Sequence, residues 1–154
     1  KRAERFNAFI GREGEGMSGS ASTGTDANIY RDCVAPALIT NAEHALREGD
    51  WSQADRSISR YLESEPRNAR AYYLKAEILR RQNGSRTDGA CIDTYEKSLE
   101  IDPTFPLSHR ALGELYYKAG HYQMAKPHFE AFLDLAPEDG SSAFIKGYLK
   151  QCQK

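Results

Sequence analysis

The sequence predicts an all-α fold in which helix-turn-helix units repeat along the chain and stack into a solenoid. The first observation is a recurring phrase that closes with proline, at Pro66, Pro103 and Pro137, with separations of 37 and 34 residues. The second is that small and large apolar residues recur at helical spacing between these prolines. A helix pair of this length cannot bury its apolar face alone, so the units are expected to stack on one another.

The composition excludes some partners. The 154 residues include 21 Lys and Arg against 22 Asp and Glu, and this balance offers no large positive field for a phosphate backbone. We therefore expect no nucleic acid partner. No stretch approaches the roughly 18 apolar residues that span a bilayer, and no signal-peptide pattern is present. We expect no direct membrane insertion by this fragment.

The cysteines bear on the compartment. Cys33, Cys91 and Cys152 are widely spaced and odd in number, which fits neither a disulfide framework nor a paired metal-binding knuckle. A reducing compartment such as the cytoplasm is favoured. Because the chain begins at Lys1 without an initiator Met, the sequence leaves open that a missing part carries an anchor or another domain.

The C-terminal unit, residues 106–139, carries the most complete repeat pattern. Its matching residues are Leu112, Gly113, Tyr116, Ala125, Phe129 and Pro137. In these residues it resembles the tetratricopeptide repeat family, from whose pattern it departs at His109 and Phe132. The resemblance implies a right-handed superhelix of about three repeats over residues 35–139.

The two preceding units show the same pattern less completely. Residues 35–68 supply Leu38, Ala42, Ala54, Ile58, Leu62 and Pro66. Residues 69–105, with three extra residues in the turn around Asn83 to Gly89, supply Tyr72, Ala76, Leu79, Cys91, Tyr95, Ser98 and Pro103. We expect the small residues of each first helix to face those of the second helix, so that the paired helices approach closely. These residues are Ala42, Ala76 and Gly113 on first helices and Ala54, Cys91 and Ala125 on second helices.

Turns and chain ends complete the predicted organisation. Gly49-Asp50 and Gly120-His121 are typical of the turn between two helices, and Thr87-Asp88 offers a cap in the lengthened turn. Residues 140–154 are expected to form a capping helix that begins near Ser141 or Ser142. Its predicted apolar face consists of Phe144, Ile145, Tyr148, Leu149 and Cys152.

Residues 1–34 are predicted to form an N-terminal extension. Residues 1–10 carry Phe6, Phe9 and Ile10 among charged residues and favour a short amphipathic helix. Residues 11–28 are rich in Gly and Ser, which is typical of a flexible linker.

The sequence favours no catalytic, metal or cofactor site. The four histidines, His44, His109, His121 and His128, lack the spacing of known metal motifs. The glycine-rich stretch 11–16 follows no predicted strand and lacks the Lys-Ser/Thr of a phosphate loop. No acid-base pair or activated nucleophile stands out. We predict that this chain is not an enzyme and has no cofactor and no metal.

The family resemblance implies a concave groove lined by positions 2, 5, 9 and 12 of each first helix. These positions hold Ile39, Glu43 and Leu46 in the first unit, Arg70, Tyr73, Glu77 and Arg80 in the second, and Leu107, Arg110, Glu114 and Tyr117 in the third. We predict that this groove binds an extended or helical segment of another protein, because Tyr and Arg are common binding hot spots. The alternative is that the charged side chains only pair with one another along a solvated face.

Three further interpretations concern the function of the chain. Relatives that grip the C-terminal carboxylate of chaperones use Lys and Asn at positions where this chain has Ile39, Glu43, Leu74, Leu107 and Ala111. We therefore do not predict a chaperone co-factor.

A second hypothesis for the function is a regulatory or recruiting domain of a larger enzyme or of a membrane or secretion assembly. A third is self-association, in which Phe6, Phe9 and Ile10 occupy the groove of the same or a neighbouring molecule.

Overall fold

The computed structural model describes residues 34–82, 84 and 89–152. The predicted segments 1–10 and 11–28, including Phe6, Phe9 and Ile10, lie outside the described residues, as does the predicted cap at Thr87-Asp88.

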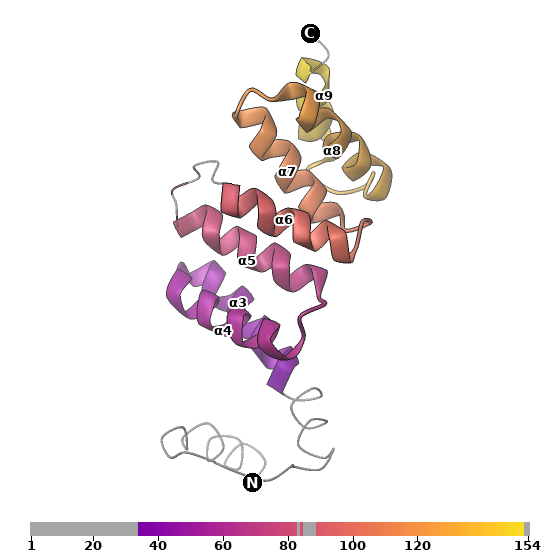
Figure 1. The fold of residues 1–154 in the computed structure, drawn as a ribbon. Helices are drawn as coiled ribbons and strands as arrows, with labels where there is room; N and C mark the ends of the chain where they lie inside the picture. Colours follow the sequence, from indigo (N-terminus) through magenta and orange to yellow (C-terminus); the bar gives the residue numbers. More distant parts are fainter. Residues whose placement is uncertain (1–33, 83, 85–88, 153–154) are drawn as a thin grey trace, which may run out of the picture.

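The described residues form seven helices and no strand. The helices are α3 (Ala35–Glu48), α4 (Trp51–Ser64), α5 (Ala69–Gln82), α6 (Gly89–Ile101), α7 (Pro106–Lys118), α8 (Tyr122–Leu135) and α9 (Ser142–Cys152). They follow one another along one direction, from α3 near the N-terminal end to α9 at the C-terminal end (Figure 1). This arrangement confirms the predicted all-α repeat solenoid.

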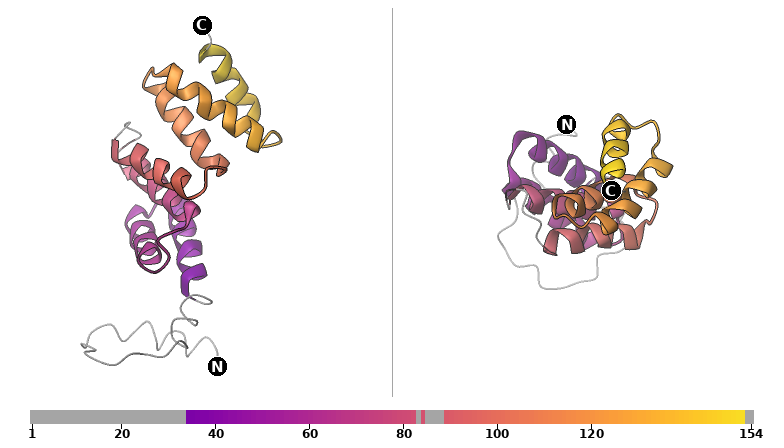
Figure 2. Two further views of the ribbon diagram at one scale, coloured as in Figure 1. Left: turned by 45° about the vertical axis from the view of Figure 1, so that its right-hand side comes forward. Right: turned by 90° about the horizontal axis from the view of Figure 1, so that it is seen from above.

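Two kinds of helix contact build the solenoid. The tightest contacts lie within the pairs α3 and α4, α5 and α6, and α7 and α8. The second helix of each pair also packs on the first helix that follows it, and the views of Figure 2 show α9 covering the C-terminal end next to α8. First helices touch directly at α3 with α5 and at α7 with α9. The first helices therefore share one side of the array.

Small residues allow the paired helices to approach closely. Ala42, Ala54, Ala76 and Ala125 are fully buried. At Gly113 the approach is closer still, since a Cβ built there would lie 2.6 Å from ring atoms of Phe129. The Phe129 ring therefore packs directly on Gly113, which explains why the sequence pattern requires a small residue at this position.

Buried hydroxyl groups tie three successive helices together. The Ser98 hydroxyl of α6 donates to the Ala69 carbonyl of α5 at 2.9 Å. The Ser108 hydroxyl of α7 donates to the Ser98 oxygen at 2.8 Å. Since both serines are fully buried, each would be costly to leave without a partner. This chain of bonds therefore joins the second unit to the third.

The predicted turns have the expected chemistry. Gly49 ends α3 in the left-handed region at φ 80°, and the Asp50 side chain caps α4 by accepting a hydrogen bond from the Gln53 N–H at 2.9 Å. Gly120 adopts φ 79° in the turn between α7 and α8. Only glycine takes up this backbone conformation without strain.

The last helix differs from the prediction at one residue, Phe144. Ile145 and Cys152 are buried and Tyr148 and Leu149 pack on the core, but Phe144 is exposed. Phe144 lies about 100° around the helix from the buried Ile145, because a helix turns by about that angle between consecutive residues. It therefore falls at the edge of the apolar face and points away from the core. The helix begins at Ser142, as predicted, with the Ser142 hydroxyl donating to the Ala136 carbonyl and the Ser141 hydroxyl donating to Asp139.

None of the helices in the described ranges is both long and apolar enough to cross a membrane.

Candidate functional site

The candidate site is the side of the array formed by α3, α5 and α7. We call it the first-helix surface and define it by the eleven residues predicted to line the groove: Ile39, Glu43, Leu46, Arg70, Tyr73, Glu77, Arg80, Leu107, Arg110, Glu114 and Tyr117. The structure brings adjacent helices together here through ion pairs between Arg70 and Glu43 and between Arg80 and Glu114. Repeated positions on different helices therefore form one continuous surface.

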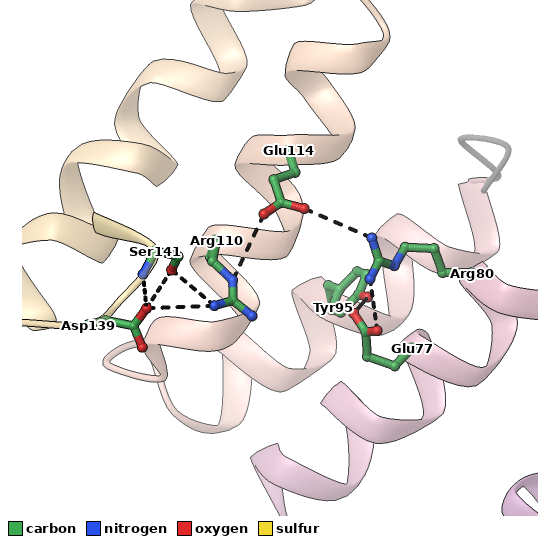
Figure 3. A network of polar contacts seen from close by, with 7 residues as sticks. All are labelled: Glu77, Arg80, Tyr95, Arg110, Glu114, Asp139 and Ser141. Atoms are coloured by element: carbon green, nitrogen blue, oxygen red, sulfur yellow. Dashed lines mark hydrogen bonds and ion pairs between the residues drawn. The ribbon is translucent and has the colours of Figure 1, made fainter. Parts of the chain in front are cut away.

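The centre of this surface is a polar network around Glu77 (Figure 3). The Glu77 carboxylate accepts a hydrogen bond from the Tyr95 hydroxyl at 2.6 Å and another from Arg80 at 2.9 Å. Burial, and then the charge of Glu77, raises the pKa of Tyr95, so the phenol remains a donor. Because Glu77 is buried and committed to these partners, it holds the surface together and is a poor contact for a ligand.

Arg110 occupies the neighbouring part of the network. Its Nη1 donates to the Ser141 hydroxyl oxygen at 3.1 Å, and its guanidinium lies 5.9 Å from the centre of the Phe132 ring. The carboxylates of Asp139 and Glu114 face it at 3.8 and 3.9 Å (Figure 3). Arg110 therefore joins α7 to the connection that leads into α9.

The N-terminal end of the surface contains a hollow of about 560 Å³. Ile39, Glu43 and Arg70 line it together with Tyr61 and Asn68, which come from α4 and the following turn. The Asn68 amide donates to the Tyr61 hydroxyl at 2.8 Å, and the Asn68 side-chain oxygen caps α5 at the Ala71 N–H. This hydrogen bonding holds one wall of the hollow in place.

The remaining predicted residues differ in their surroundings. The Tyr73 ring packs between Tyr95 and Phe105, at 5.9 and 5.6 Å between ring centres, and is only partly buried. Burial, and then the charge of Glu77, raises its pKa. Ile39 and Leu46 pack against the core of the first two units, and Leu107 is half-buried at the start of α7.

Tyr117 marks the C-terminal end of the surface, where aromatic residues gather. Its ring lies 4.7 Å from Tyr148 and 5.3 Å from Tyr122 between centres, and its hydroxyl donates to Gln151. A hollow of about 690 Å³ opens beside it, lined also by Tyr122 and Met124. The α9 residues were missing from the predicted groove, although the repeat spacing continued past residue 139 would have found them.

Two histidines, His109 of α7 and His128 of α8, contact one another. His109 Nε2 lies 2.9 Å from the Pro103 carbonyl, which can only accept, so Nε2 carries the proton. His109 Nδ1 lies 3.1 Å from His128 Nδ1, so one of these two nitrogens donates to the other. Within the described ranges, no group of three or more His, Cys, Asp or Glu residues could hold a metal ion.

This histidine pair predicts an acid-sensitive fold. Burial, and then the neighbouring His109, lowers the pKa of His128 from 6.5 to about 4. Between these values the unfolded chain binds a proton that the folded chain does not, so stability is lost as the pH falls from 6.5 toward 4. We expect the melting temperature to drop over this range and the drop to be smaller in His128→Phe. Equal slopes for the two proteins would contradict this assignment.

Comparison with known proteins identifies the family. Models of the tetratricopeptide repeat match residues 39–105 and residues 106–139. The chain belongs to the tetratricopeptide repeat family. Its N-terminal match covers the first two helix pairs and its C-terminal match covers α7 and α8.

Similar proteins place this repeat domain among others of its family. The tetratricopeptide repeat and J domain-containing co-chaperone DNJ1 of Cryptococcus neoformans is 28% identical over 102 residues, which cover 64% of this chain. The matched part is only 18% of that relative's length.

Solved structures share the fold at low identity. The type III secretion translocator chaperone SycD of Yersinia enterocolitica is 15% identical, with a TM-score of 0.71 over 89% of this chain and 94% of SycD. The TPR2B domain of yeast Sti1, solved as a complex with pHsp70, is 18% identical, with a TM-score of 0.66 over 77% of this chain and 95% of that chain.

Proposed function

We propose that this chain is a non-catalytic protein-interaction module that holds an extended or helical segment of a partner on the first-helix surface. The observation that carries the proposal is that arginine and tyrosine side chains stay accessible there. Arg70 is exposed and Tyr73 is partly exposed, and both residue types are enriched among binding hot spots. The ring of Tyr73 packs against the buried Tyr95, and Arg70 is hydrogen-bonded to Glu43, which reduces the entropy cost of binding.

The relatives support the general class of function. The Sti1 domain was solved in a complex with pHsp70, and the Cryptococcus relative is a co-chaperone. The absence of the Lys and Asn pattern, with Ile39, Glu43 and Leu107 in its place, still argues against a grip on a chaperone's terminal carboxylate. We therefore propose that this surface recognises its partner segment by contacts other than a grip on a terminal carboxylate.

Arg70 is the best site for a test, because its side chain is mostly exposed and its ion pair with Glu43 is a surface pair. Arg110 is less suitable, since its side chain is only 27% exposed, packs on the Phe132 ring and is faced by two carboxylates, those of Glu114 and Asp139. The probe is a displayed library of random peptides selected on the immobilised chain. We expect Arg70→Glu to weaken binding of the selected peptides about tenfold with an unchanged melting temperature.

Arg56→Glu provides the matched control, because Arg56 is exposed on α4, outside the first-helix surface. It makes the same change in net charge at a different place. Selection of no peptide, or an equal effect of both variants on affinity, would overturn the proposed function.

A second candidate is a recruiting domain of a larger protein. It is favoured by the Cryptococcus relative, in which the matched residues are a small part of a chain that also has a J domain. Reading the gene upstream of Lys1 tests it, since an open frame for a catalytic or membrane domain would support it.

A further inference from the structure

The hollow of about 690 Å³ beside Tyr117 adjoins the C-terminal end of the first-helix surface. The turn after α7, the start of α8 and the end of α9 form its walls. Two large apolar side chains of α8 line it with much of their surface accessible, Tyr122 at 46% and Met124 at 50%. Exposed apolar area gathered in one hollow is typical of a binding site.

An equivalent ring in the first unit is covered by the following first helix. Trp51 begins α4 as Tyr122 begins α8, and each follows a turn glycine in the left-handed conformation. The Arg81 guanidinium of α5 lies 5.6 Å from the centre of the Trp51 ring. Trp51 is only partly exposed and packs against the core of the first two units.

The residue of α9 that would cover Tyr122 in the same way is a cysteine. The closing prolines lie 37 and 34 residues apart, and these repeat lengths carry the position of Arg81 to Lys118 in α7 and to Cys152 in α9. Cys152 lines the hollow, but its thiol is one bond beyond Cβ and cannot extend over a ring as a guanidinium does. This position therefore does not give Tyr122 the cover that Trp51 has.

The anion that accompanies Arg81 is also replaced. Arg81 lies 3.7 Å from the Glu77 carboxylate. Two repeat lengths later, the position of Glu77 is occupied by Tyr148. The described residues that line the hollow include no Asp, Glu, Lys or Arg. A charged side chain would lose hydration there without gaining an ion pair, whereas an apolar side chain gains by burial.

We propose that a large, uncharged apolar side chain of the partner segment binds in this hollow and covers the rings of Tyr117 and Tyr122. Tyr117 belongs both to the first-helix surface and to the hollow, so a segment held on that surface can place one side chain there. Met124 also lines the hollow, and its flexible thioether side chain adapts to different apolar groups. This inference rests on the proposed function and specifies the chemistry of one anchor residue of the ligand.

The test uses the full chain and peptides selected from the displayed random library. Each large apolar residue of a peptide is changed in turn to alanine and to arginine. Fluorescence anisotropy then gives the affinity for the unmodified chain, for Met124→Ser and for Leu135→Ser. Leu135 is the matched control, because it is an exposed apolar residue of the same helix that does not line the hollow. Both changes replace an exposed side chain, so neither is expected to impair folding.

We expect one apolar residue of the selected peptides to be coupled to the hollow. Its change to alanine should weaken binding about tenfold to the unmodified chain and to Leu135→Ser, but much less to Met124→Ser. Its change to arginine should weaken binding at least as much. An arginine that preserves or improves the affinity would show that the hollow takes a cation. Equal losses in all three proteins would show that no peptide residue occupies the hollow, and either result would overturn the inference.

This outcome can be separated from that of the proposed function. Peptides that lose affinity with Arg70→Glu but show no coupling to Met124→Ser would leave the first-helix surface as the binding site and remove only the anchor. Failure to select any peptide would overturn both.

Discussion

Replacing Glu77 by alanine is expected to lower the free energy of unfolding by about 3–5 kcal/mol. The carboxylate accepts hydrogen bonds from Tyr95 and Arg80 and also faces Arg81 at 3.7 Å. Without it, the buried Tyr95 hydroxyl has lost its acceptor and the mostly buried Arg80 has lost its nearest anion. Arg80 Nε is already buried without a hydrogen-bond partner, so the site has little capacity to compensate.

Glu43→Ala is the matched control for this prediction. This variant also removes a glutamate of the first-helix surface that pairs with an arginine. The arginine, Arg70, is mostly exposed. Exposed pairs contribute at most about 1 kcal/mol. Urea unfolding of both variants, followed by circular dichroism, measures the difference. Similar losses in the two proteins would show that burial of the Glu77 network does not govern stability.

Gly113→Ala is expected to destabilise the fold by about 1–3 kcal/mol, the usual cost of overpacking a core. Alanine favours a helix over glycine by up to about 1 kcal/mol, so propensity alone predicts the opposite sign. The new methyl group would meet the ring of Phe129 at 2.6 Å. Because Phe129 is itself fully buried between α7, α8 and α9, the ring has little room to move.

Gly147→Ala separates propensity from packing. Gly147 also lies within a helix, but a Cβ added there meets no atom within 4 Å. We expect this variant to gain about 0.5–1 kcal/mol, because glycine costs that much in a helix interior. Thermal or urea unfolding should therefore give opposite signs for the two substitutions. A gain in stability at both positions would contradict the close contact of Gly113 with Phe129.

The Glu77 prediction bears on which residues should be tested for binding. Loss of Glu77 is expected to weaken the fold, so a loss of affinity in that variant would not identify a ligand contact. Arg70 and Met124 are exposed and are better probes. The predicted groove thus divides into residues that hold the surface in place and residues that remain available to a partner.

The repeat fold can be predicted from the sequence alone. The closing prolines, the small residues at Ala42, Ala76 and Gly113, and the turn at Gly49-Asp50 each act within one unit. Helical spacing, turn conformation and close packing of paired helices depend on residues that are near in sequence, so their pattern can be recognised along the chain. The apolar face of α9 was predicted in part, with Phe144 wrongly included.

The distribution of charged and aromatic side chains between core and surface depends on contacts between helices and cannot be predicted from the repeat pattern. The three repeats each have a glutamate at the same position, Glu43, Glu77 and Glu114. The side chain of Glu77 is buried and hydrogen-bonded to Tyr95, whereas that of Glu43 pairs with an exposed arginine. The contact of His109 with His128 was likewise not predicted. The burial of a polar side chain depends on its neighbours from other helices, and the repeat pattern does not specify those neighbours.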